Sequence, residues 1–235
     1  MNTELLSERL HEALINGDRP AARAVVADAA RAGATPEQIV TDLFWPVYED
    51  VQKLYRADKM TRLAHHFATR LLRVLVDQTA QSFTKRQSVG RNVFAICGPE
   101  DADELAAQMA VDLLEREGFT ITFAGGGIAN DEILERVQET QPDALLIFAS
   151  APTDLPNIRS LIDQIREIGA CANVQTVVGG GVFNRAEGLA AEIGADLWAN
   201  SPAELAQAMM TSSNRRADAE QQTVGRKRRL KSQAA

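Results

Sequence analysis

The second half of the chain alternates short apolar runs with amphipathic segments, and this alternation restricts the fold more than any other feature of the sequence. The runs are Val93–Ile96, Thr120–Ala124, Ala144–Ala149, Val174–Val178 and Asp196–Ala199. Continuous apolar runs of this length indicate strands that are buried on both faces. The segments between and after them have helical periodicity: Glu104–Glu117, Asn130–Glu139, Asn157–Ile168, Ala186–Ile193 and Pro202–Met210. Strands that alternate with helices predict an α/β domain, a flavodoxin-like, doubly wound parallel sheet of five strands.

Residues 1–83 show only helical periodicity. Their apolar residues recur every three or four positions in four to five segments separated by short polar breaks, which predicts a helical bundle. In the last segment, Thr61–Phe83, the apolar positions expected to face inward are Leu63, Phe67, Leu71, Val74 and Leu75. The polar segment 84–91 is expected to be a linker, and the sheet domain is expected to cover 92–211.

The net charge of −7 hides an asymmetry between the body and the C-terminal tail. From Ser213 on, seven Lys and Arg residues face two acidic ones, a net charge of +5, so the preceding residues carry −12. An acidic body repels phosphate backbones, which makes it a poor nucleic-acid platform. Residues 212–235 are expected to form a basic, disordered tail, and segment 226–231 is the candidate for nonspecific contact with nucleic acid or an acidic partner.

Nothing in the sequence predicts a membrane segment or a secretory leader. No apolar stretch approaches the roughly 20 residues of a membrane span, and the N-terminus is polar and periodic. Cytoplasmic localisation is therefore expected. Cys97 and Cys171 fit no metal-ligand spacing and are expected to be buried free thiols.

Ligands of open α/β sheets bind beyond the carboxyl ends of the strands, and two of the loops expected there are rich in glycine. Gly125–Gly127 is expected to form a tight turn. Gly179, Gly180 and Gly181 would let the backbone approach a flat or bulky ligand closely, next to Ser150 after the preceding strand. Neither loop is followed by the Lys-Ser/Thr of a Walker motif, and the first strand lacks GxGxxG, so a nucleotide site is not predicted.

Several short motifs together resemble the cobalamin-binding module of methionine synthases, corrinoid proteins of methyltransferases and light-sensing B12 regulators. They are Glu-Gly-Phe at 117–119, Ala-Ser-Ala at 149–151, Val-Val-Gly-Gly-Gly at 177–181 and Gly-Ala-Asp at 194–196. The resemblance covers roughly residues 91–210. It implies a cobalamin cofactor held between the sheet domain and a helical cap, which residues 1–83 would supply.

Part of the bundle resembles the cap of the light-sensing regulators. In that family a Trp is followed ten and eleven residues later by Glu-His, and here Tyr55, His65 and His66 stand at those places. The resemblance implies that these three residues contact the upper face of the cofactor. His66 is then the candidate metal ligand. Adjacent helical residues point about 100° apart, so at most one of the two histidines faces the sheet domain.

The chain departs from the family at the lower face of the cofactor. The family's Asp-x-His-x-x-Gly signature places a cobalt-binding imidazole after the first strand, and here its three places hold Asp101, Asp103 and Ala106. A carboxylate does not suit the cobalt of a corrin as an imidazole does. Cobalamin is therefore expected to keep its own base or to leave its lower face open. Another tetrapyrrole in the same space is an alternative.

Three functions remain open. A non-enzymatic sensor or regulatory module that signals through a protein partner is the leading hypothesis, because of the cap pattern. A corrinoid carrier subunit for methyl transfer and a ligand-free interaction scaffold are the alternatives. No Ser-His-Asp arrangement or metal cluster supports an unrelated enzyme. A homo-oligomer is left open.

Overall fold

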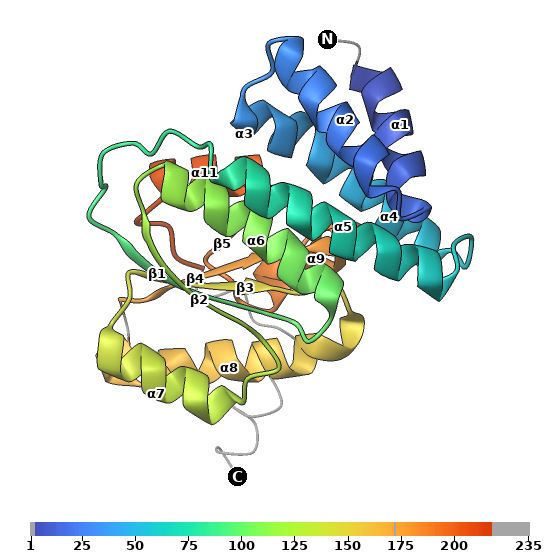
Figure 1. Cartoon of the computed structure of the whole chain (residues 1–235). Helices are drawn as coiled ribbons and strands as arrows, with labels where there is room; N and C mark the ends of the chain where they lie inside the picture. Colours follow the sequence, from blue (N-terminus) through green and yellow to red (C-terminus); the bar gives the residue numbers. More distant parts are fainter. Residues whose placement is uncertain (1–2, 172, 218–235) are drawn as a thin grey trace.

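The computed structural model of the chain describes residues 3–171 and 173–217, in which a helical bundle precedes an α/β domain (Figure 1). The basic segment 226–231 lies outside the described residues. The bundle consists of α1 (Thr3–Ile15), α2 (Arg19–Arg31), the short α3 (Pro36–Gln38), the π-helical η1 (Ile39–Phe44), α4 (Trp45–Arg56) and α5 (Arg62–Ala80).

Side chains of Asp18, Thr35 and Thr61 cap the starts of α2, α3 and α5. Thr35 accepts a hydrogen bond from the amide of Gln38, while the Gln38 side chain accepts one from the amide of Thr35, which forms a capping box. Pro46 does not end the helical path, because the π-helical turn η1 precedes it and α4 continues from Trp45.

The sheet has five parallel strands in the order β2-β1-β3-β4-β5, which confirms the flavodoxin-like prediction. The strands are β1 (Asn92–Cys97), β2 (Thr120–Gly126), β3 (Ala144–Phe148), β4 (Gln175–Gly179) and β5 (Leu197–Trp198). All of β3 and β4 is buried, as their continuous apolar runs require.

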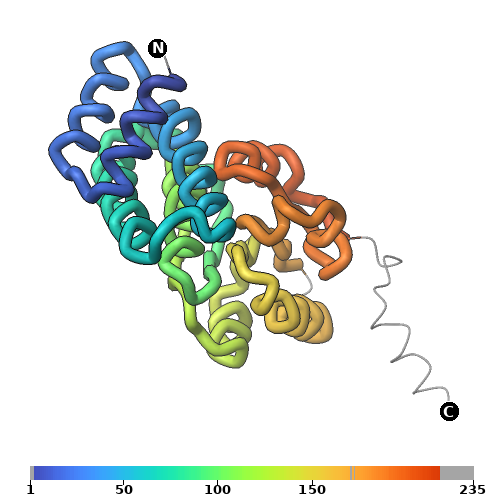
Figure 2. Tube along the Cα trace, turned by 90° about the vertical axis from the view of Figure 1, so that its right-hand side faces the viewer, coloured from blue at the N-terminus to red at the C-terminus, as the bar shows by residue number. Residues whose placement is uncertain are grey.

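Helices cover both faces of the sheet. α6 (Asp101–Arg116) and α11 (Pro202–Thr211) lie on the face toward the bundle, and α7 (Asn130–Thr140) and α8 (Leu155–Glu167) lie on the other (Figure 1). The remaining elements are short: η2 (Pro152–Asp154), η3 (Gly169–Cys171), α9 (Gly181–Arg185) and α10 (Leu189–Glu192). Figure 2 shows the bundle stacked on one side of the α/β domain, opposite α7 and α8.

One apolar core joins the bundle to the sheet domain. It runs from Leu10 and Phe44 in the bundle through Leu105 and Met109 of α6 to Leu146 of β3, all of them buried. A second core lies between the other face of the sheet and α8. The bundle is therefore packed on the sheet domain through α6.

The inward face of α5 differs from the sequence-based expectation. Leu71 and Leu75 are buried, but 63% of Leu63 and 43% of Phe67 are exposed. His65, Ala68, Thr69, Leu72 and Val76 take the buried positions instead. The helix therefore presents apolar side chains to solvent as well as to the core.

Residues 212–217, which the sequence pattern assigns to the tail, contact the sheet domain. The guanidinium of Arg215 lies 4.6 Å from the centre of the Trp198 ring, and Gln175 donates a hydrogen bond to the carbonyl of Arg215. Arg216 donates to the carbonyl of Asn173 over 2.9 Å. The α/β domain thus extends past α11, at least to these residues.

Among the described helices, none combines the length and the apolar character needed to cross a membrane. Cys97 and Cys171 are both buried and unbridged, as predicted.

Candidate functional site

Helix α4 lies against the carboxyl edge of the sheet. The buried Tyr48 hydroxyl donates a 2.9 Å hydrogen bond to the carbonyl of Ala102 in the first turn of α6, and burial raises the pKa of Tyr48. The Trp45 ring stacks on Tyr48 with 5.2 Å between ring centres. We call this contact between α4 and the loops after β1, β3 and β4 the seam. It lies where open α/β sheets bind their ligands.

Asp103 is the buried carboxylate of the seam. Only 1% of the residue is exposed, and its Oδ2 has no hydrogen-bond partner among the described residues. Burial raises the pKa of Asp103 to about 6; a hydrogen bond from Ser150 opposes this increase, and the nearby carboxylates of Asp154 and Glu100 add to it. This carboxyl therefore holds its proton to a higher pH than an exposed aspartate does.

The carboxylates of Asp103 and Asp154 both lie close to the backbone of Gly98. A Cβ on Gly98 would lie 2.4 Å from Asp103 Oδ2 and 3.1 Å from Asp154 Oδ2, so both oxygens converge on the backbone at this position. No side chain fits there. The sequence did not indicate this pairing, because Asp103 and Asp154 follow different strands.

Gly179 at the end of β4 and Gly180 after it approach the protein's own side chains and backbone. A Cβ on Gly180 would lie 2.3 Å from the carbonyl oxygen of Ala149, and the φ of Gly180 is +102°. A Cβ on Gly179 would lie 3.0 Å from the Phe148 ring. Packing within the fold therefore already requires glycine at position 180 and leaves little room for a side chain at position 179, whether or not a ligand approaches them.

Two arginines that the sequence did not indicate lie at the open end of the seam. Arg185 donates a 2.7 Å hydrogen bond to the carbonyl of Ser150, and its Nη1 faces Gly181, as does Nη1 of Arg56 from α4. Burial and the neighbouring Arg56 charge lower the pKa of Arg185. Within the described residues, neither guanidinium has a carboxylate in ion-pair distance. No motif marks these arginines, because they come together only through tertiary packing.

The structure brings Tyr55, His65 and His66, the three residues that the cap resemblance indicates, next to one another in the bundle. The rings of Tyr55 and His65 stack with 3.9 Å between centres, and those of His65 and His66 are 6.2 Å apart. His65 is buried and its Nε2 lies 3.2 Å from Gln52 Oε1. His66 is half-buried, and its ring nitrogen accepts a weak 3.4 Å hydrogen bond from Arg62.

The histidine cluster and the seam share one face of α4. Tyr48, Gln52 and Tyr55 are spaced four and three residues apart, which aligns them on the helix. Burial lowers the pKa of His65, the charge of His66 acts in the same direction, and the charge of exposed Asp101 opposes them. Asp101 is thus close enough to His65 to interact with it electrostatically, whereas Asp103 belongs to the seam.

These residues do not fit a corrinoid that is coordinated by a lower imidazole. At the place that the family resemblance assigns to that ligand stands the buried carboxylate of Asp103. The seam is also closely packed: the hollow bordered by Trp45, Phe148, Gly180 and Leu205 leaves no room for a water molecule. A corrin ring at this edge therefore requires α4 to move away from the sheet.

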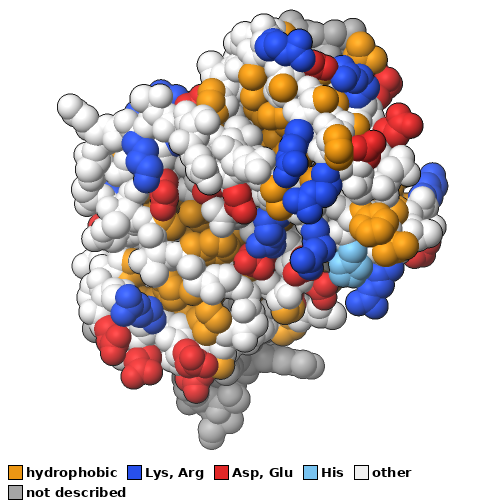
Figure 3. All heavy atoms as spheres, in the orientation of Figure 1, with side chains coloured by type: hydrophobic (Ala, Val, Ile, Leu, Met, Phe, Trp, Pro, Cys, Tyr) orange, Lys and Arg blue, Asp and Glu red, His pale blue; other side chains and the backbone are white. Residues whose placement is uncertain are grey.

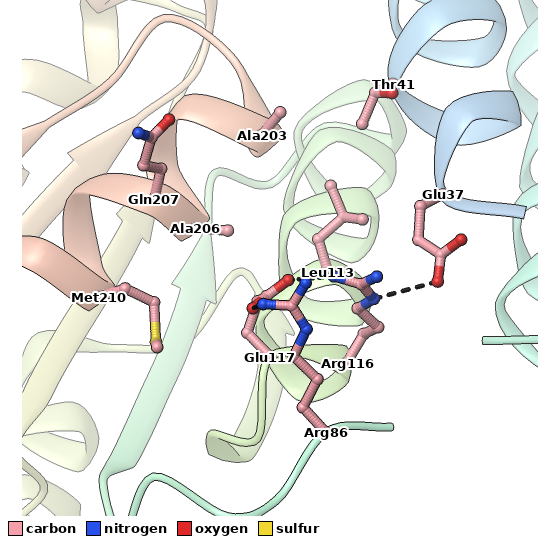
Figure 4. A pocket seen from close by; sticks show the side chains of 10 residues that line it. All are labelled: Glu37, Thr41, Arg86, Leu113, Arg116, Glu117, Ala203, Ala206, Gln207 and Met210. Atoms are coloured by element: carbon pink, nitrogen blue, oxygen red, sulfur yellow. Dashed lines mark hydrogen bonds and ion pairs between the residues drawn. The ribbon is translucent and has the colours of Figure 1, made fainter. Parts of the chain in front are cut away.

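A second hollow lies at the C-terminal end of α6, where residues of the bundle, the linker, α6 and α11 meet (Figure 4). Its volume is about 380 Å³, and its charged groups come from α3, the linker and α6. Arg116 pairs with Glu37 over 3.0 Å and with Glu117, and Arg86 pairs with Glu117 over 2.7 Å. Since these charges neutralise one another, the hollow offers no charge to a ligand.

Comparisons with known proteins agree with the two-part architecture. Residues 91–207 match a family described as "B12 binding domain", and residues 6–79 match a second family with the same description. The chain is 24% identical to Trimethylamine corrinoid protein 2 of Methanosarcina mazei over 78% of this chain and 85% of the relative. It is also 24% identical to the Trimethylamine corrinoid protein of Methanosarcina barkeri, over 85% of this chain and 93% of the relative.

A solved structure shows the same fold over most of its length. The Methanosarcina barkeri monomethylamine corrinoid protein superposes with a TM-score of 0.77 at 18% identity, covering 88% of this chain and 98% of that protein. The family matches support the predicted cobalamin cofactor, and they include the helical bundle as well as the sheet domain. The chain belongs to the B12-binding domain family.

Proposed function

We propose that the chain is a corrinoid carrier subunit for methyl transfer, with the corrinoid between α4 and the carboxyl edge of the sheet. One observation carries this proposal: the similarity to the trimethylamine corrinoid proteins runs through both the bundle and the sheet domain, over 85% of the chain. These relatives favour the carrier over the sensor, which the cap pattern alone had favoured.

Asp103 distinguishes this carrier from one with a lower imidazole. The corrinoid would keep its own base or leave its lower face open, because a carboxylate is a poor replacement for an imidazole. Bound cobalt supplies the methyl-accepting centre in such proteins. The chain's own contribution would be the seam, which excludes water, and Tyr48, which fixes α4 to α6.

We expect the purified full chain to retain about one equivalent of cobalamin after incubation with hydroxocobalamin and desalting, measured from the corrin absorption spectrum. Retention follows from the enclosed position at the seam, where release requires α4 to move. A parallel incubation with haemin tests the alternative tetrapyrrole. A monodisperse protein that stays colourless with both would contradict the carrier and favour the ligand-free scaffold.

Replacing Asp103 by His, together with Ala106→Gly, should create the lower ligand that the chain lacks. In the ¹⁵N-labelled variant reduced to Co(II), electron paramagnetic resonance should show coupling to one protein nitrogen, which the wild type should lack. Asp101→His is the matched control, because Asp101 is exposed and lies outside the seam. Identical spectra for the wild type and the Asp103→His variant would place the cobalt away from α6.

The sensor is a second candidate because of His66. This half-buried imidazole adjoins the stacked pair of Tyr55 and His65, and its one hydrogen bond to a described residue is long, at 3.4 Å. An upper ligand from His66 would make the spectrum of the bound corrinoid sensitive to light. A light-dependent change in the wild type that His66→Ala abolishes, with retention unchanged, would support the sensor over the carrier.

A further inference from the structure

Helix α5 presents an apolar stripe to solvent that no other described element covers. Leu63, Phe67, Arg70 and Val74 are spaced four, three and four residues apart, so they follow one face of the helix. Leu63 is 63% and Phe67 43% exposed, and Val74 is half-buried. Large apolar side chains that gather on one face indicate a contact surface more often than isolated ones do.

A hollow of about 650 Å³ adjoins the stripe. It lies between the turn that joins α1 to α2, the outer face of α5 and the first turns of α6. Phe67 forms part of its wall and packs on the turn, where a Cβ on Gly17 would lie 3.4 Å from the ring. A protruding apolar side chain of a partner would therefore find both an aromatic wall and a depression beside it.

Cationic side chains surround this hollow. Figure 3 shows Lys and Arg side chains in a line over this face, next to hydrophobic ones. Arg73 pairs with Glu104 over 3.0 Å, whereas Arg19 and Arg70, which are both exposed, have no carboxylate in ion-pair distance within the described residues. Uncompensated arginines are notable in a chain with a net charge of −7.

We propose that the α5 patch, defined as Leu63, Phe67, Arg70, Val74 and Arg19, is a docking surface for a protein segment that carries carboxylates next to an apolar side chain. Exposed Arg and aromatic side chains are the types that contribute most to protein interfaces. The proposal goes beyond carrier function, because docking at the patch needs no corrinoid.

Charge and composition argue against other occupants. A second copy of the chain related by a two-fold axis would place the arginines of the two patches close to each other. Nucleic acid would meet Asp101 and Glu104 on the same wall, in an acidic body. An acidic, amphipathic protein segment satisfies both the arginines and the exposed rings.

A labelled helical peptide with Leu and Glu four residues apart provides the probe, and fluorescence anisotropy with the full chain measures its binding. We expect saturable binding that weakens as salt concentration rises. Phe67→Asp and Arg70→Glu should each weaken it at least about tenfold. Both side chains are exposed, so thermal melting should show that these variants remain folded.

Two matched variants and one peptide serve as controls. Arg136→Glu on α7 reverses an exposed arginine on the other side of the sheet, and Met210→Asp replaces another exposed apolar side chain; neither should affect binding. A peptide with Lys in place of Glu should not bind. Any of three results would overturn the proposal. The acidic peptide fails to show saturable binding, the two peptides bind equally well, or the acidic peptide binds the Arg70→Glu variant as well as it binds the wild type. Self-association in sedimentation experiments that Phe67→Asp abolishes would assign the patch to a second copy instead.

Discussion

Gly180→Val is expected to lower the free energy of unfolding by about 3 kcal/mol or more. The φ of Gly180 is +102°, a region that a β-branched residue avoids, and its Cβ would lie 2.3 Å from the carbonyl oxygen of Ala149. That oxygen belongs to the backbone of the loop after β3 and cannot rotate away as a side chain would. Urea denaturation followed by circular dichroism measures the loss.

Gly125→Ala separates the two causes. The φ of Gly125 is +81°, but nothing lies within 4 Å of the place of its Cβ, so this variant should lose only about 1 kcal/mol. Equal losses for the two variants would show that the Ala149 carbonyl yields to the new side chain. If Gly180→Val lowers the free energy of unfolding this strongly, weaker ligand binding by the variant would reflect a disturbed fold. It would not show that a ligand lies close to Gly180.

The fold was predictable because its signals are local. A strand such as β3 is a continuous apolar run, and a helix such as α2 or α6 repeats apolar residues at helical spacing, so each is visible within a dozen residues. The parallel order then follows from the alternation of strands and helices. The π-helical turn η1 was not predictable, because its apolar spacing reads equally well as an ordinary helix.

Packing between distant elements was less accessible from the sequence. Leu63 and Phe67 share a helical face with Val74, while Leu71, Leu72 and Leu75 form a second apolar face, and periodicity alone does not tell which of the two is buried. The structure buries the second. The first stays exposed at Leu63 and Phe67.

The sequence motifs indicated candidate residues for the site, but not their mutual contacts. The structure brings Tyr55, His65 and His66 next to one another and places Asp103 at the seam, whereas their predicted contact with a cofactor stays a prediction. Tyr48 was missed because its acceptor, Ala102, lies 54 residues away and is a backbone group of an unremarkable residue type. No spacing in a single sequence indicates such a contact.

Asp103→Asn is expected to stabilise the protein by about 2–3 kcal/mol at pH 7 and to leave its stability nearly unchanged at pH 4. The pKa of Asp103 is about 6 in the fold against an ordinary value of 3.8. Between these values the folded state binds more protons than the unfolded state, so the contribution of Asp103 is most favourable below pH 4. This favourable contribution to the free energy of unfolding is lost as the pH rises to about 6. Asparagine does not ionise, so the Asp103→Asn variant should not lose stability in this way. Urea denaturation from pH 4 to pH 8 measures the difference.

Asp112→Asn provides the comparison, because burial also raises the pKa of Asp112 to about 6. Asp112 accepts a 2.6 Å hydrogen bond from Gln108 on the same helix and lies outside the seam. Both variants should therefore reduce the fall in stability between pH 4 and pH 6, whereas only Asp103→Asn should change the binding of a corrinoid. If Asp103→Asn is instead less stable than the wild type at pH 7, a neighbouring positive charge compensates the ionised Asp103 carboxylate in the fold. Arg185 is the candidate for that charge, since Asp103 raises the pKa of this arginine. In that case Arg185→Gln should destabilise the wild type more than it destabilises the Asp103→Asn variant.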